Sequence, residues 1–111
     1  MPYDLTFVKP GVETDAVASR LLPALQQRYG DDVRSDDAYI KFGDDDVALA
    51  IEIFAGDREG AFRVTLTSST RHLAFLKTIE DVPQLEELKR IVAGEIAEWT
   101  GRLPDVLPMS G

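Results

Sequence analysis

A dense group of carboxylates in residues 31–46, called here the acidic segment, is the feature of this sequence with the clearest chemical consequence. Seven of the 20 acidic side chains lie there: Asp31, Asp32, Asp36, Asp37, Asp44, Asp45 and Asp46. Arg34 and Lys41 offset two of them, so the segment carries −5 of the formal net charge of −8. Clustered carboxylates can hold a divalent cation, act as an acid–base pair or attract a basic macromolecule.

A dedicated cation loop is the first of these alternatives. Calcium takes about six to eight oxygen ligands, supplied at alternate loop positions around a glycine turn and closed by a distal glutamate. Neither residues 31–37 nor residues 44–46 have that spacing, and no glutamate stands twelve positions into either loop. The pattern therefore predicts no specific metal site and no cofactor.

Catalysis is the second alternative. Aspartates in short polar loops stay ionised, whereas general acid–base catalysis needs a cleft in which the pKa of one carboxyl group is raised. His72 is the only histidine and has no nucleophile signature around it, and the absence of cysteine excludes thiol nucleophiles. We therefore interpret the chain as non-enzymatic. The alternative is a small-molecule-binding or catalytic domain with a site between sheet and helices, near Arg71, His72 and Glu52.

Composition limits the partners. The 111 residues are 44% hydrophobic and 29% charged, which is typical of one globular domain. A sequence pI near 4.5 opposes binding to nucleic acid or to anionic lipid. No apolar run approaches the roughly 20 residues of a membrane span, and the amino terminus lacks the basic and apolar regions of a signal peptide. We expect a cytoplasmic protein that binds neither nucleic acid nor membrane.

Two segments have helical periodicity. Apolar residues four positions apart predict a helix over residues 14–29, in which Pro23 marks either a kink or a restart. A second helix is predicted to begin near Pro83 and to end at Gly101. Its core positions are Leu85, Leu88, Val92, Ile96 and Trp99. Gly94, with Ala93 and Ala97, gives this helix a strip of small residues for close packing inside the monomer or in a homodimer.

Between the helices the period of the apolar residues changes to two. Residues 38–67 are predicted to form a three-strand antiparallel meander. Its buried face is expected to include Ile40, Phe42, Leu49, Ile51, Phe62 and Val64. Glu52 falls in a solvent-facing position, with Lys41 or Arg63 as its cross-strand partner.

The remaining segments complete the predicted architecture. Residues 3–8 alternate weakly and predict a short strand, and residues 71–79 fit a fourth strand better than a helix turn. The order (β)αβββ(β)α predicts an α+β two-layer sandwich, in which two helices cover one face of an antiparallel sheet of three to five strands. We expect a single domain over residues 1–103 and a C-terminal tail over residues 104–111.

These features together predict a function in protein interaction. The acidic segment would bind a basic protein, with Tyr39 and Phe54 as apolar anchors and Tyr29 as a third candidate beside them. Size and charge are loosely similar to those of immunity or antitoxin-type neutralisers, and the αβββ order is loosely similar to that of small acidic secretion chaperones. Neither likeness depends on a motif, so no residue role is transferred from those classes.

Overall fold

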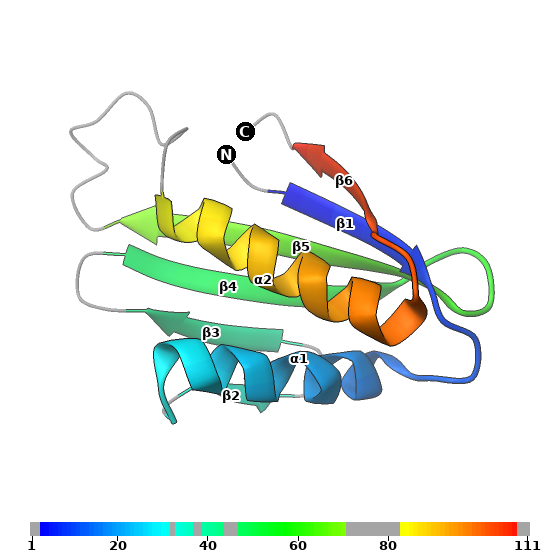
Figure 1. Ribbon diagram of the computed structural model, residues 1–111, viewed down its shortest axis with the longest axis horizontal. Helices are drawn as coiled ribbons and strands as arrows, with labels where there is room; N and C mark the ends of the chain where they lie inside the picture. The colour runs from blue at the N-terminus through cyan, green and yellow to red at the C-terminus, as the bar shows by residue number, and fades with distance from the viewer. Residues whose placement is uncertain (1–2, 32, 37–38, 44–46, 71–82, 109–111) are drawn as a thin grey trace.

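The computed structural model describes residues 3–31, 33–36, 39–43, 47–70 and 83–108. These residues form six strands and two helices (Figure 1). In chain order the elements are β1 (Tyr3–Val8), α1 (Thr14–Tyr29), β2 (Arg34–Asp36), β3 (Tyr39–Gly43), β4 (Val47–Ala55), β5 (Ala61–Thr70), α2 (Pro83–Thr100) and β6 (Asp105–Pro108). Neither described helix is long and apolar enough to cross a membrane.

The strands form one antiparallel sheet in the order β2-β3-β4-β5-β1-β6. Strands β3, β4 and β5 are the meander that the alternating apolar residues predict. Ile51 pairs with Ile40 on one side and with Leu66 on the other, so three apolar side chains meet across the centre of one face. Antiparallel neighbours joined by short turns need no crossover, which is why this part of the fold can be predicted from the sequence alone.

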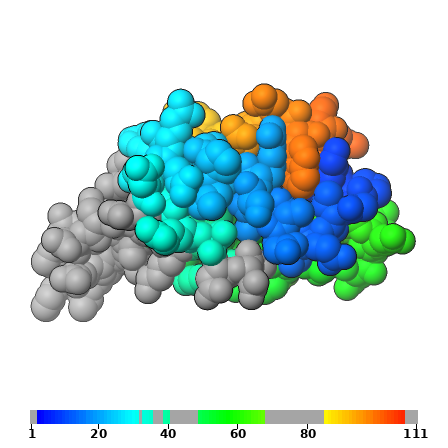
Figure 2. Space-filling model, turned by 90° about the horizontal axis from the view of Figure 1, so that it is seen from below, coloured from blue at the N-terminus to red at the C-terminus, as the bar shows by residue number. Residues whose placement is uncertain are grey.

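Both helices lie on the same face of the sheet (Figure 1). Figure 2, viewed along the layers, shows the helix residues in the upper part of the molecule, above strand residues. The core between the layers includes Val17, Leu21 and Leu25 from α1 and Leu85, Leu88, Val92 and Ile96 from α2. The α+β class and the two covering helices are therefore as predicted.

The first helix runs without a restart through Pro23, whose side chain is exposed. Gly30 follows with a φ of 107°, a conformation that glycine adopts at little cost, and its N–H donates to the carbonyl of Gln26. The second helix ends in the same way at Gly101, with a φ of 79°. These stops return the chain to the sheet after each helix.

Two edge strands differ from the prediction. The sheet has six strands rather than three to five, because β2 and β6 add one strand at each edge. The segment predicted to be a C-terminal tail contains β6, which pairs with β1 from Tyr3–Pro108 to Thr6–Asp105. Both strands are short, and β6 ends in a proline that only an edge position tolerates, so neither has the alternating pattern of a longer strand. The strand predicted over residues 71–79 lies outside the described residues.

The strip of small residues in α2 also differs from the prediction. Gly94 is exposed, and a Cβ placed on it would meet nothing within 4 Å. Close packing inside the monomer is therefore not the reason for a glycine at this position.

Replacing Gly94 with alanine should stabilise the protein by up to about 1 kcal/mol, because glycine in a helix interior costs backbone entropy. Gly101→Ala is the matched control: this position also has open space around it but has a positive φ. It should destabilise by about 1 kcal/mol or more. Urea unfolding of both variants measures the difference, and equal effects would contradict this account.

Ile51→Ala should lower the free energy of unfolding by about 2–5 kcal/mol, because Ile51 is fully buried at the centre of the sheet. Its neighbour Glu52 is exposed, so Glu52→Ala should change stability by less than about 0.5 kcal/mol. Urea unfolding of this adjacent pair checks the register. A loss below about 1 kcal/mol for Ile51→Ala would mean that the register is wrong.

Candidate interaction surface

The face of the sheet turned away from the helices, called here the open face, is the main exposed surface of the strands. Leu5 and Phe7 of β1 are buried under the helices, so Val8 points to the opposite side. The same alternation places Tyr39, Phe54 and Leu107 on the open face, opposite the buried Ile40 and Ile53 and the inward Val106. Of the six large hydrophobic side chains that are exposed among the described residues, these four lie on the open face.

Cross-strand register arranges the open face in rows. One row runs from Tyr39 through Glu52, Thr65 and Asp4 to Leu107, and the Thr65 hydroxyl donates to Asp4 Oδ1 at 2.5 Å. The next row runs through Phe54, Arg63, Thr6 and Asp105. Residues from five strands and from both ends of the chain therefore share one surface.

Tyr39 and Phe54, the two predicted anchors, lie close together on this face. Tyr39 pairs with Glu52, and Phe54 stands two positions further along the same strand. Diagonal neighbours of this kind are about 7–8 Å apart. Their exposed fractions are 39% and 37%, so each ring presents part of its surface to solvent and part to the sheet.

Tyr29, the third candidate anchor, does not belong to this surface. It ends α1 in the helix layer, where it packs against the core, and the Arg28 guanidinium lies 5.1 Å from its ring centre. Burial is the main cause that raises the pKa of its hydroxyl, followed by the nearby Glu87 carboxylate. Helical spacing alone could not show that Tyr29 and Tyr39 lie in different layers.

The described part of the acidic segment includes the edge strand β2 and its neighbour β3. Asp31 is exposed just after α1, and Asp36 ends β2, where it pairs with Tyr39. Asp32, Asp37, Asp44, Asp45 and Asp46 lie outside the described residues. β2 and β3 form an antiparallel hairpin whose pairs run from Arg34–Lys41 to Asp36–Tyr39.

Glu52 is exposed on the open face, as the alternation predicts, but its predicted partners are not opposite it. The register pairs Glu52 with Tyr39 and Thr65, whereas Lys41 pairs with Ala50 and Arg63 with Phe54. The Arg63 guanidinium lies 4.6 Å from the Phe54 ring centre. The ion pair was predicted one row out of register, because periodicity gives the face of a residue and not its cross-strand partner.

A catalytic site between sheet and helices cannot include Glu52, because the helices cover the other face. Arg71 and His72 lie outside the described residues. Among the described residues the buried set is entirely apolar. The described residues also contain no group of three or more histidines and carboxylates placed to hold a metal ion.

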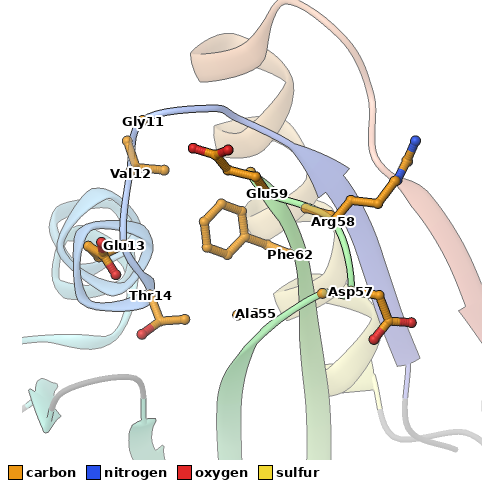
Figure 3. Close-up of a pocket in the computed structure, with 12 residues that line it drawn as sticks. Gly11, Val12, Glu13, Thr14, Ala55, Asp57, Arg58, Glu59 and Phe62 are labelled. Atoms are coloured by element: carbon orange, nitrogen blue, oxygen red, sulfur yellow. The ribbon is translucent and has the colours of Figure 1, made fainter.

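A hollow of about 400 Å³ lies at the end of the sheet, between the start of α1 and the β4–β5 turn (Figure 3). Figure 3 shows the Phe62 ring within it, Glu59 above the ring, and Val12 and Thr14 along the helix side. Asp57 and Arg58 come from the same turn but point away from the hollow. No signal in the sequence indicates this hollow, because its two walls come from turns about 45 residues apart in the chain.

Polar contacts join the helix layer to β1 and join the helices to each other. The Tyr3 hydroxyl donates to the Glu86 carboxylate, and Lys89 Nζ lies 3.0 Å from the same group. Glu87 pairs with Arg28, and Glu95 lies 3.7 Å from Arg20 across the helix pair. These contacts fix the helix layer in place and leave the open face as the candidate interaction surface.

Comparison of the chain with protein-family models, with curated proteins and with solved structures gave no match. The function is therefore inferred from the exposed residues of the open face. Val8 and Leu107 are the residues of that surface that the sequence analysis missed. Leu107 is an apolar residue in the segment predicted to be a tail. Its place on the open face follows only from the pairing of β6 with β1.

The hydrogen bond from Tyr3 is the largest cause that lowers the pKa of Glu86 below its ordinary value of 4.5, and Lys89 adds to it. A lowered pKa contributes stability that is present above pH 4.5 and is lost as the pH falls through the folded value. Tyr3→Phe should move the pKa of Glu86 up toward 4.5. An NMR titration of the Glu86 carboxyl carbon measures this, and Tyr39→Phe is the control that should leave it unchanged.

Proposed function

We propose that this protein is a non-enzymatic interaction domain that binds a basic protein through the open face and the acidic segment beside it. Tyr39 and Phe54 are the central anchors, and Val8 and Leu107 are further exposed apolar side chains on β1 and β6, separated from the anchors by polar side chains of the same face. The acidic segment, represented by Asp31, Asp32, Asp36, Asp37, Asp44, Asp45 and Asp46, supplies the charge that selects a basic partner. Neutralising a basic toxin, or escorting a basic client as a chaperone, are the roles that suit such a surface.

The observation that carries this proposal is the placement of the exposed apolar side chains. Single exposed apolar residues are ordinary, but several on one uncovered sheet face, next in sequence to the acidic segment, form the arrangement of an interface. Aromatic anchors supply affinity once water is excluded, whereas clustered like charge mainly raises the association rate and fixes orientation. The two features complement each other at the β3–β4 part of the sheet.

A structural role for the acidic segment is the alternative to test. Edge strands expose unpaired N–H and C=O groups, and charged side chains along an edge discourage pairing with another chain. β2 is such an edge strand. If the aspartates serve only this purpose, removing some of them should promote self-association without changing the capture of any basic protein.

The test is capture from a native lysate with matched variants. Asp44→Asn, Asp45→Asn and Asp46→Asn remove three charges from the acidic segment. Asp57→Asn, Glu59→Gln and Glu98→Gln remove three exposed charges elsewhere and give the same net charge. A basic protein retained by the wild type and the control but lost with the acidic-segment variant is the expected result. Equal capture by all three, or no basic protein at all, would contradict the proposal.

Association rates then separate the roles of charge and anchors. The partner should bind the wild type several-fold faster at 0.01 M salt than at 0.15 M, because the Debye length falls from about 30 Å to about 8 Å. The acidic-segment variant should lose most of this salt dependence. Tyr39→Ala should instead accelerate dissociation about tenfold or more, because truncation of an aromatic anchor typically costs more than 1 kcal/mol. Stopped-flow mixing measures both rates.

A further inference from the structure

Three arginines border a pair of adjoining hollows where β1, the β4–β5 turn and the α2–β6 connection meet. One hollow, of about 370 Å³, is lined by Arg58 and Arg102, and the other, of about 210 Å³, by Arg58 and Arg63. Thr6, Phe7, Val8, Arg58 and Asp105 line both. We propose that this arginine cluster binds a phosphate monoester of a small molecule, a function additional to the capture of a basic protein, although the two sites share Val8.

Strand register places the centre of the site. Thr6 of β1 pairs with Arg63 on one side and with Asp105 on the other, so the three side chains share one row of the open face. The Arg63 guanidinium carbon lies 4.6 Å from the centre of the Phe54 ring, on the neighbouring strand β4. Contact with a ring limits the freedom of the arginine side chain and leaves its N–H donors available.

The β4–β5 turn fixes the backbone that carries Arg58. The Lys9 N–H donates to the Gly60 carbonyl at 2.7 Å, and the Gly56 N–H donates to the Ala61 carbonyl at 2.7 Å. Gly60 has a φ of 79°, and a Cβ there would come within 2.9 Å of Pro10 Cα. The turn is therefore packed directly against the β1–α1 loop. Figure 3 shows the Arg58 side chain pointing away from the Phe62 hollow, across β1 toward the α2–β6 connection.

Arg102 lines the larger hollow from the α2–β6 connection. Gly101 reverses the chain at the end of α2 with a φ of 79°, and Arg102 is the next residue. The Thr100 hydroxyl lies 2.8 Å from the Ile96 carbonyl and accepts the Arg102 N–H at 3.3 Å. The cluster thus draws on three separate segments, each with a defined backbone.

Among the described residues, the three arginines of the cluster form no ion pair. Arg20 and Arg28 form ion pairs with glutamates. Arg58, Arg63 and Arg102 form none with any residue that the structure describes, although the chain as a whole carries −8. Asp105 is the one carboxylate in the lining of these hollows, which leaves a charge of +1 around each hollow and +2 around the two together.

That charge selects the ligand class. A phosphate monoester carries about −1.5 to −2 near neutral pH and offers three acceptor oxygens to guanidinium groups. A single carboxylate would neutralise only half of the local charge. Asp105 and Thr6 can bond hydroxyl groups of the esterified alcohol, and Val8, which is 51% exposed, offers it an apolar contact. These neighbours favour a phosphorylated polyol or sugar over inorganic phosphate.

The experiment is an NMR titration of the full chain at pH 7.5 and constant ionic strength. The probes are glycerol 3-phosphate, inorganic phosphate and, as a non-phosphate anion, acetate. We expect saturable amide shifts centred on Thr6, Arg63 and Asp105 with glycerol 3-phosphate, at a Kd of about 1 mM or tighter. Inorganic phosphate should bind several-fold more weakly, and acetate should not saturate.

Matched variants test the assignment to this cluster. Arg58→Gln, Arg63→Gln and Arg102→Gln should each weaken binding about five- to tenfold, because each removes a charged donor. Arg34→Gln and Arg90→Gln remove exposed arginines elsewhere and should change the Kd less than twofold. All five positions are exposed, so folding should be retained, and an unchanged amide spectrum verifies it.

Three results would overturn the proposal: no saturation with glycerol 3-phosphate, equal losses in the control variants, or equal binding of acetate. None of them bears on the capture of a basic protein, which is measured with variants of other residues. Failure of that capture would likewise leave the phosphate site unaffected. The two proposals are therefore tested independently.

Discussion

Pairing of β4 with β5 at the centre of the sheet is the interaction on which the rest of the structure depends. It joins Ile51 to Leu66 and Ile53 to Val64 on the face that the helices cover. Because side chains alternate along a strand, the side chains between these positions lie on the open face: Glu52, Phe54, Arg63 and Thr65. A register shift of one residue would exchange the two sets, and neither the core nor the open face would remain.

Covering one face and leaving the other open has a functional consequence. Two helices are enough to bury the apolar side of the sheet, and polar contacts such as Tyr3–Glu86 and Arg28–Glu87 fix their positions. The open face is then a rigid platform whose side chains do not contribute to the core. Such a platform suits binding, because anchors on paired strands lose little freedom when a partner docks.

The three arginines lie far from the β2 edge in the strand order. Arg58, Arg63 and Arg102 line hollows near β1 and β6, whereas Asp31 and Asp36 of the acidic segment lie next to β2 and in it. At physiological ionic strength the Debye length is about 8 Å, so charges on distant strands of the sheet are largely screened from one another. An acidic protein can therefore hold a local site for an anion.

The sequence by itself determined the elements whose pattern is local. Alternating apolar residues located β3, β4 and β5 and the buried positions Ile40, Leu49, Ile51, Phe62 and Val64, and helical spacing located both helices. The side chain of Phe42 lies outside what the structure describes. Charge counting found the acidic segment, and alternation gave Glu52 its exposed position, because these properties depend only on residues near each other in the chain.

Only the tertiary structure determined which residues from distant parts of the sequence are neighbours. Strand β6 pairs with β1 across about 100 residues of sequence, and that pairing brings Asp105 beside Thr6 and Leu107 into the row of Tyr39. The same long-range pairing gathers Arg58, Arg63 and Arg102 from a turn, a strand and a connection. Periodicity reports the face on which a side chain lies but not its neighbours across the sheet. Those neighbours depend on strand order and register, which the folded core selects as a whole.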